Sequence, residues 1–532
     1  MNEYFKTIFS ANYDDVITQI EYISQTACAY CVLRFLNVQS ISHFTKNTDE
    51  LQNDFISVTK KFTICNFCVS CHNILPALSN IKFREKLSTY ILTSGFEYNQ
   101  YLLNVTIPPY YLLNDAIYKH QLIQMNYKVY TQSEDKYIKR KENFEDTSFK
   151  KIMLSVIPIK KAAKFILGPY LSKSLDVPVH YLSYFRCEIT LKSTQQIKWT
   201  QQQLSQLPKS LRRIRSKEIR QGAEADIGLD AEVSRIISKD GYNINILKQM
   251  CQPPEVEPVI DFQFNIDRDP VYITGRYLKL QRGIAQTGDE KQESDEDQDI
   301  QSLPYAMNTI LEPIFRKYVD FDKFVFHAAG REDIDVRMLG NGRPFIAELQ
   351  QAKNACRLDW IKISIEIDQE LGKQNFIRIY NQQLAIYEKF KDKLMVALYS
   401  GGQEKQKKYR AVCCANKIID NIHIENLNLV QKTPIRVLHR RSLMNRAKTI
   451  FKIATTAQKG NFFTIDILAS AGAYIKEFVH GDFGRTFPNL RDFIGADVEI
   501  LQLDVMGVEM VWPPADVPQW IETIGDPDEK YE

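Results

Sequence analysis

Residues 330–345 (GREDIDVRMLGNGRPF) combine three acids and three arginines with glycines that permit unusual backbone conformations. The acids are Glu332, Asp333 and Asp335, and they follow a strand-like run, KFVFHA (323–328). A carboxylate in a closed pocket stays ionised only beside a cation, because burial alone favours the protonated form. The segment is therefore a candidate site in which a carboxylate works among cationic side chains.

Five of the ten cysteines fall within 44 residues, in the motifs CAYC (28–31) and CNFCVSC (65–71). A two-residue spacing lets both thiolates of a C-x-x-C motif reach one tetrahedral zinc ion, so two motifs predict a four-sulfur structural site. Buried free thiols are the alternative, and disulfides are disfavoured in an intracellular chain. The spacing does not decide which two cysteines of CNFCVSC would bind. The remaining cysteines lack ligand spacing and are expected in the core: Cys187, Cys251, Cys356, Cys413 and Cys414.

The charges are unevenly distributed, although the formal net charge is only +3. Six basic residues crowd into 209–220 and seven, counting one histidine, into 432–448, whereas 288–299 is strongly acidic. Such basic clusters can bind a polyanion while the overall charge stays near neutral. A solvated helix face is the alternative for each cluster.

The chain of 532 residues is too long for one hydrophobic core, so at least two domains are expected. It contains 44% hydrophobic and 25% charged residues, and its mean hydropathy is −0.31. The sequence contains no run of about 18 apolar residues, so no membrane span is predicted. The N-terminal stretch lacks a signal or transit pattern. We expect an intracellular monomer, located in the cytoplasm, the nucleus or both.

A proline-rich stretch, CQPPEVEP (251–258), marks the expected boundary between two domains. We predict an accessory domain over 1–255, a second domain over 256–525 and a tail over 526–532. Short helices are expected around the cysteines. After the boundary, VIDFQFNI and VYITGRYLKL (259–280) alternate like a β-hairpin. Recurring strand-like runs separated by helical patterns predict an α+β fold.

Three motifs in order resemble one family of RNA-modifying enzymes: GRED (330–333), KTPIRVLHRR (432–441) and GAYIKEFVHGDFGRT (472–486). The first resembles the G-R-x-D signature of pseudouridine synthases, and together the three resemble the archaeal and eukaryotic tRNA pseudouridine-54/55 synthase family. The resemblance covers residues 256–515 and, more loosely, the N-terminal half. It implies a catalytic domain with a central mixed, largely antiparallel sheet, and an accessory domain with a zinc site and a THUMP-type RNA-binding fold.

The resemblance also implies the reaction, which is isomerisation of uridine to pseudouridine at position 54 or 55, or both, of the tRNA TΨC loop. Cleavage of the N1–C1′ bond leaves an electron-poor sugar that a carboxylate can trap or stabilise. A glycal route, in which the carboxylate takes a proton from C2′, is equally open. The reaction requires no redox or nucleotide cofactor.

The resemblance assigns Asp333 as the catalytic carboxylate and Lys476 as its cationic partner on an extended strand. Tyr409 of KKYRAV matches the tyrosine that holds the flipped base. Tyr474 is expected to bind substrate. We expect Asp335, two residues from Asp333, to face the opposite side, and we assign it a structural role.

Arginines on two loops are expected to grip the tRNA, mostly through phosphates. Lys432 and the arginines of 432–441 match the thumb loop of the family. The loop GRYLKLQRGIAQT (275–287) matches the opposing loop, although it lacks the family's proline and tryptophan. The arginines assigned to substrate binding are Arg282, Arg331, Arg436, Arg440 and Arg441.

For the zinc site, the resemblance favours Cys28, Cys31, Cys68 and Cys71, because the last cysteine of a motif in this family opens directly into an amphipathic helix. HNILPALSNI, which follows Cys71, has that pattern. Cys65 is then a bystander or a replacement ligand.

Two other functions compete with this interpretation. Asp333, Asp335 and Glu348 could be the acidic set of a metal-dependent nuclease, although Gln350 stands where that class has a lysine. A non-catalytic RNA-binding protein is the second alternative, and the presence of Asp333, Tyr409 and Lys476 argues against it.

Overall fold

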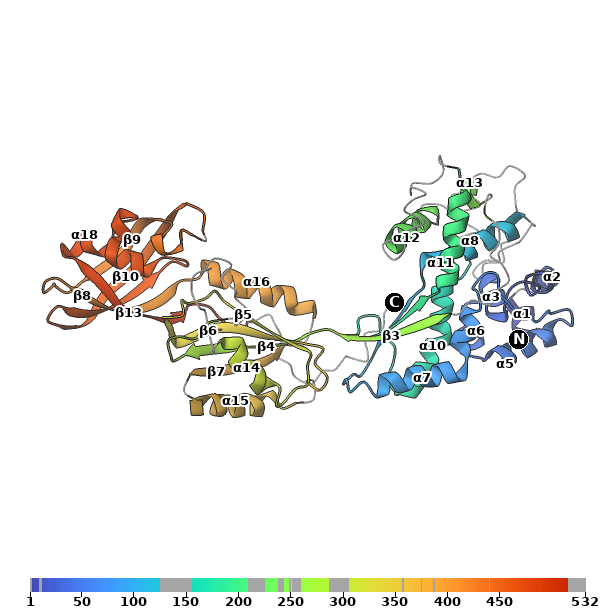
Figure 1. Cartoon of the computed structure of the whole chain (residues 1–532). Helices are drawn as coiled ribbons and strands as arrows, with labels where there is room; N and C mark the ends of the chain where they lie inside the picture. Colours follow the sequence, from blue (N-terminus) through green and yellow to red (C-terminus); the bar gives the residue numbers. More distant parts are fainter. Residues whose placement is uncertain are drawn as a thin grey trace. The chain divides into compact units, whose positions relative to one another are not determined.

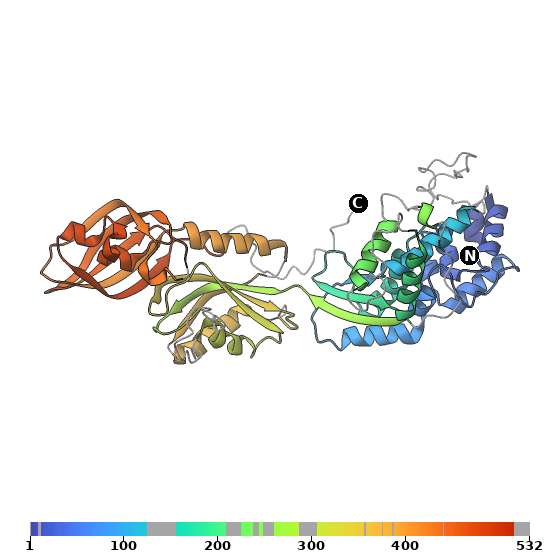
Figure 2. The same ribbon diagram turned by 45° about the horizontal axis from the view of Figure 1, so that its top comes forward.

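The computed structural model (Figures 1 and 2) describes residues 2–8, 12–124, 156–208, 225–237, 244–247, 250, 260–286, 306–355, 358–374, 376–385, 388–439 and 441–514. The chain forms two compact units, Met1–Ser94 with Tyr98–Asp267, and Gly95–Glu97 with Arg268–Glu532. The basic cluster 209–220, the acidic stretch 288–299, Arg440, the predicted boundary near 255 and the tail 526–532 lie outside the described residues.

The first unit begins with short helices around the cysteine motifs. Their apolar residues, such as Val16, Ile20, Leu51 and Phe55, are fully buried and form a small helical core. The helices are α1 (Asn2–Ile8), α2 (Tyr13–Ile23), α3 (Ala29–Phe35), α4 (Ile41–Phe44), α5 (Thr48–Val58), α6 (Ile74–Ser79) and α7 (Ile81–Leu92).

A three-stranded sheet in the order β1-β2-β3 completes this unit. Its strands are β1 (Leu102–Thr106), β2 (Phe185–Lys192) and β3 (Asp261–Arg268), and β1 runs parallel to β2. The further helices are α8 (Pro109–Gln124), α10 (Ile159–Leu175), α11 (Thr194–Gln206), α12 (Ala225–Ile236) and α13 (Ile244–Leu247). The unit is therefore an α+β domain, as predicted.

The predicted hairpin over 259–280 is wrong. β3 joins the sheet of the first unit, whereas β4 (Val271–Lys279) pairs with β6 and β7 of the second unit. Phe262 and Phe264 of β3 pack against Phe83 of α7, with ring centroids 4.6 and 5.5 Å apart. Alternation of side chains identifies a strand but not its partner, because the same pattern suits either sheet.

The second unit contains a ten-stranded sheet in the order β12-β9-β10-β11-β8-β13-β6-β4-β7, with β5 paired to β6. Most neighbours are antiparallel, and β13 runs parallel to β6. The predicted mixed, largely antiparallel sheet is confirmed. The strands not yet given are β5 (Lys323–Ala328), β6 (Arg337–Gln350), β7 (Ile377–Ala385), β8 (Lys407–Ala415), β9 (His423–Lys432), β10 (Asn445–Lys459), β11 (Phe462–Ala469), β12 (Thr486–Phe487) and β13 (Val498–Val508).

Helices cover both faces of the β4–β6 region (Figure 2). Phe345 points toward α14 (Met307–Phe315) and α15 (Trp360–Gln374), in the main hydrophobic core. Its neighbour Ile346 points to the other face, where it packs with Leu394 and Leu398 of α16 (Glu388–Glu404). The smaller α17 (Ile475–His480) and α18 (Leu490–Ile494), with the 3-10 turns η3 (Ile435–Val437) and η4 (Gly481–Gly484), lie near the β9 end.

The glycines of the 330–345 segment allow β6 and β13 to approach closely. Gly340 has φ +59°, and a Cβ atom there would lie 1.9 Å from the carbonyl oxygen of Met506. At Gly507, a Cβ atom would lie 1.8 Å from Oδ1 of Asn341. At Gly340 only glycine fits, because the contacted atom belongs to the backbone and cannot move aside. The permissive backbone thus serves the junction of the two strands.

Across the part of the chain that the structure describes, no helix is long and apolar enough to cross a membrane.

Candidate active site and metal centre

Asp333 lies in the turn that connects β5 with β6. The backbone N–H of Val336 donates to the carbonyl of Asp333 at 3.0 Å, and that of Gly283 donates to Ile334 at 2.9 Å. The ammonium of Lys279 on β4 also donates to the Asp333 carbonyl at 3.0 Å. Contacts from β4 and the loop after it therefore fix the backbone that carries the carboxylate.

Glu332 points inward from this turn, into a buried polar network. Its side chain, only 3% exposed, accepts from Nε of Arg343 at 2.9 Å and from the Tyr277 hydroxyl at 3.1 Å. Lys279 lies 3.8 Å away. Arg343 also donates to the carbonyl of Ala329 at 2.7 Å. These charges are all buried, and a buried charge is stable only when it is paired. The network therefore holds the turn in one conformation.

Asp333 points outward and remains accessible, with 40% of its side chain exposed. Arg436 of η3 lies 3.1 Å from its Oδ2, and Lys476 of α17 lies 3.7 Å from the same oxygen. A second carboxylate, the buried Glu477, accepts from Nε of Arg436 at 2.7 Å and so orients this arginine. The sequence predicted the cation at 476 but not the closer one at 436, which was expected to contact phosphate.

Lys476 makes its shorter contact with Asp335, at 2.7 Å. The prediction that Asp335 faces away from Asp333 is wrong, since Lys476 contacts both carboxylates. Residues two apart would share a face even in an extended segment. The extended strand expected for Lys476 is also wrong, since this residue lies in α17. Burial raises the pKa of Asp335, but the hydrogen bond and charge of Lys476 outweigh it and hold the pKa below the usual value.

Tyr409 lies on β8 between β11 and β13, and is 8% exposed. Burial raises the pKa of its hydroxyl to about 12, although the nearby Arg343 charge opposes the shift. The phenol is therefore neutral at physiological pH and can offer an aromatic face or a proton donor. The charge of Asp333 adds to the shift, which places the two groups in one electrostatic environment.

Tyr474 immediately precedes α17 and contacts residues in and beside the segment 432–441, here called the thumb segment. Its backbone N–H and carbonyl both bond the side chain of Gln431, each at 2.9 Å. Arg441 donates to its hydroxyl at 2.8 Å, and the guanidinium of Arg436 lies 6.0 Å from its ring centroid. The tyrosine thus gathers two of the predicted RNA-binding arginines beside Asp333.

The other predicted arginines lie in different surroundings. Arg282 bridges strands, since it donates to the carbonyl of Leu503 at 2.9 Å and pairs with Asp504 at 2.7 Å. These contacts tie its loop to β13. Arg331 is exposed on the turn that carries Asp333. The predicted contacts of all these arginines with RNA stay predictions.

The acidic set of the nuclease alternative does not assemble. Glu348 accepts hydrogen bonds from Gln350 at 2.9 Å and pairs with His327 at 3.0 Å, on the opposite part of β6 from the Asp333 turn. Within the described ranges, the cysteines are the only close group of three or more His, Cys, Asp or Glu side chains suited to a metal.

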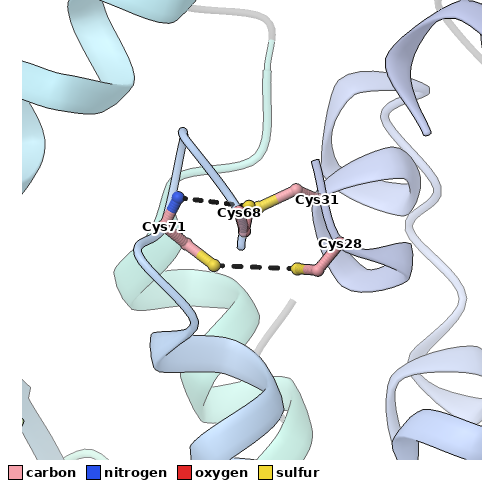
Figure 3. A group of neighbouring side chains, drawn as sticks. All are labelled: Cys28, Cys31, Cys68 and Cys71. Atoms are coloured by element: carbon pink, nitrogen blue, oxygen red, sulfur yellow. Dashed lines mark hydrogen bonds between the residues drawn. The ribbon is translucent and has the colours of Figure 1, made fainter. Parts of the chain in front are cut away.

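Cys28, Cys31, Cys68 and Cys71 form that group (Figure 3). All four are buried, and their sulfur atoms lie within 4.8 Å of one another. The Cys28 and Cys71 sulfurs are 3.7 Å apart, close to the spacing of about 3.8 Å in a tetrahedral site with zinc–sulfur bonds of about 2.3 Å. Cys65 is partly exposed, lies outside the group and donates to the Phe67 carbonyl. The four buried thiols can hold a metal ion.

Local structure brings the two motifs together. Cys28 precedes α3, which carries Cys31, and the loop with Cys68 and Cys71 leads into α6. The buried Arg34 donates to the Cys31 sulfur at 3.1 Å and to both oxygens of Asp115 at 3.0 Å. A cation beside the sulfurs suits a site in which four thiolates would outweigh the charge of a divalent ion.

Comparison with known proteins gives consistent matches. The family model described as "Pus10, C-terminal" matches residues 272–509. The human "tRNA pseudouridine synthase Pus10" is 28% identical over 539 residues, covering 96% of this chain and 93% of the relative. The relative of that name from Methanocaldococcus jannaschii is 34% identical over 254 residues, covering 45% of this chain and 53% of the relative.

Among solved structures, a chain of the "Cbf5-Nop10-Gar1 Complex" overlays 43% of this chain and 47% of its own length, at 13% identity. Its TM-score is 0.24, so no argument rests on the overlay.

The matched family model and the relatives that bear the name identify an isomerase of the pseudouridine synthase class. The chain belongs to the Pus10-type family.

Proposed function

We propose that this protein isomerises uridine to pseudouridine in tRNA, at position 54 or 55, or both, of the TΨC loop. The observation that carries the proposal is the accessible Asp333 carboxylate, held on a locked turn between two cations, with Tyr409 nearby. Relatives along nearly the whole chain bear the name tRNA pseudouridine synthase.

The geometry suits glycosidic bond cleavage. The Asp333 carboxylate would approach C1′ of the flipped uridine while the N1–C1′ bond breaks. It then forms an ester with C1′, which breaks when C5 bonds to C1′, or it takes the C2′ proton to give a glycal and returns that proton to C2′ as C5 bonds to C1′. The base turns, C5 bonds to C1′, and the C5 proton leaves to N1 through solvent or the carboxylate. Arg436 and Lys476 hold the carboxylate in place, and Tyr409 offers its ring to the base.

The remaining parts take supporting roles in the proposal. A zinc ion bound by Cys28, Cys31, Cys68 and Cys71 would cross-link the helices of the first unit without entering the chemistry. The first unit would act as a THUMP-type accessory domain that contacts the tRNA. The protein would act as a monomer in the cytoplasm, the nucleus or both.

Asp333→Asn tests the proposal. The amide keeps the shape but can act neither as nucleophile nor as base, so pseudouridine formation should fall below about 1% while the Kd for tRNA changes less than about threefold. Transcripts with cytidine at position 54 or 55 assign the target by the position at which pseudouridine is mapped. Turnover by Asp333→Asn comparable to the wild type would refute the role of this residue, and a wild type without product would refute the activity.

A further inference from the structure

Phe483 is an exposed aromatic residue in an unfavourable backbone conformation. It is 93% exposed and has φ +54°, and the preceding Asp482 has φ +45°. Left-handed backbone is costly for a bulky residue, and an exposed phenyl ring gains nothing from the hydrophobic effect. The Phe483 ring gains no burial that would offset this conformation, so a function outside the folding of the chain is the simplest reason for its exposure.

The loop around Phe483 is anchored to the thumb segment rather than loosely attached. Asp482 is buried, and its Oδ2 accepts from the Ile435 backbone N–H at 3.3 Å. The N–H of Asp482 donates to Nδ1 of His480 at 3.1 Å. The N–H of Lys432 donates to the Arg485 carbonyl at 2.9 Å. These bonds hold the ring outward beside η3, which carries the arginine that pairs with Asp333.

A second exposed aromatic residue and two cations share this edge. Phe487 on β12 is 68% exposed and lies opposite Val430 of β9, which is 48% exposed. Lys432 and Arg485 make no ion pair with any residue that the structure describes. Two carboxylates of the neighbouring segments have other partners, since Asp482 accepts from Ile435 and Glu477 binds Arg436.

We propose that Phe483, Phe487, Lys432 and Arg485 form a stacking platform for an unpaired stretch of the substrate RNA next to the reacting uridine. Aromatic rings that stack on bases, interleaved with cations that contact phosphates, are how proteins hold single-stranded nucleic acid. A protein partner is less suited, because the cations would be left unpaired in an apolar interface. The platform rests on the proposed function and names the RNA segment that the active site recognises.

The test measures the Kd for an unmodified tRNA transcript by fluorescence anisotropy, the rate of pseudouridine formation at saturating tRNA, and the melting temperature. Phe483→Gly removes the ring and relieves the backbone strain, so its melting temperature should equal or exceed that of the wild type. Its Kd should rise about 5- to 150-fold, equivalent to about 1 to 3 kcal/mol for one stacked base. Phe483→Trp restores a stacking face and should bind within about threefold of the wild type.

Phe462→Ala is the matched control, because Phe462 is 55% exposed at the start of β11 and lies outside the platform. It should leave the Kd unchanged. An unaltered Kd for Phe483→Gly would overturn the platform, and this includes the case in which the rings contact a protein instead. If wild-type protein binds and modifies tRNA while Phe483→Gly behaves identically, only the platform fails. If wild-type protein forms no pseudouridine, the proposed function fails.

Discussion

At the scale of single residues, the site depends on which side chains of one turn point into the protein and which point toward solvent. Glu332 points into the protein and meets Arg343, Lys279 and Tyr277, whereas Asp333 points out toward Arg436 and Lys476. The buried acid fixes the turn, and the exposed one is available to substrate. Two adjacent carboxylates thus serve different ends because one is desolvated and paired while the other is accessible.

Lys407 provides a test of this buried electrostatic environment. It is 7% exposed on β8, two residues from Tyr409, and burial together with the Arg343 charge lowers its pKa to about 8. Below pH 8 the folded protein holds a buried ammonium at a cost. Between pH 8 and about 10.5 the folded state releases this proton before the unfolded chain does, so the stability of this unit should rise with pH.

Lys407→Met should therefore stabilise the protein at pH 7, by up to about 3 kcal/mol, and should remove that rise. Urea unfolding at a series of pH values measures both effects. Lys408→Met is the control, because the exposed pair of Lys408 with Glu509 contributes little. A pH dependence equal to that of the wild type would show that Lys407 does not titrate as described.

The sequence predicted the site residues that belong to short local motifs. It did not predict the residues that only the folded chain brings together. Asp333 follows a glycine-arginine signature, and the cysteines lie in two short motifs. The partners of Glu332 come from two strands, and no periodicity distinguishes Arg343 or Lys279 from surface cations. The pairing of Arg436 with Asp333 arises because the segments, about a hundred residues apart, meet only in three dimensions.

At the scale of elements, the junction of β6 and β13 determines where the Asp333 turn can lie. The two strands run parallel at Arg337–Asp504 and Met338–Val505, and the side chains of Arg337 and Asp504 also pair at 2.6 Å. The Asp333 turn ends immediately before this junction, so a displacement of β6 would move Asp333. The sequence did not predict that the two strands pair, because the alternation of side chains does not identify a strand's neighbours.

Gly340→Ala tests this coupling. The new Cβ atom would clash with the Met506 carbonyl, so we expect a loss of stability of several kcal/mol, in the range of other overpacked or strained sites. Gly460→Ala is the control, since Gly460 has a similar φ of +60° but open space around it. It should cost only about 1 kcal/mol. Thermal unfolding of both variants measures the difference, and equal losses would contradict the role of the close contact.

At the scale of the whole molecule, the four-cysteine group and the Asp333 turn belong to different units. A metal ion bound by the four cysteines would cross-link α3 to the loop before α6, and Arg34 extends the connection to Asp115 on α8. Because metal binding contributes directly to folding free energy, its loss should act on the first unit.

Cys71→Ser should therefore lose the metal and lower the melting temperature of the first unit, while the transition of the second unit stays in place. Cys65→Ser should keep one metal ion per chain and melt like the wild type, since Cys65 lies outside the group. Mass spectrometry of the native protein measures metal content, and calorimetry measures the transitions. Loss of metal from Cys65→Ser with retention in Cys71→Ser would reverse the ligand assignment.

The pair of Glu332 and Arg343 also has a consequence for inheritance. A lineage that replaced either residue alone would leave an unpaired charge in the interior, beneath the turn that carries Asp333. A single substitution at either position should therefore not persist in a functional protein. Descendants should either keep both residues or exchange them together, so the two positions form one heritable character although ten residues separate them.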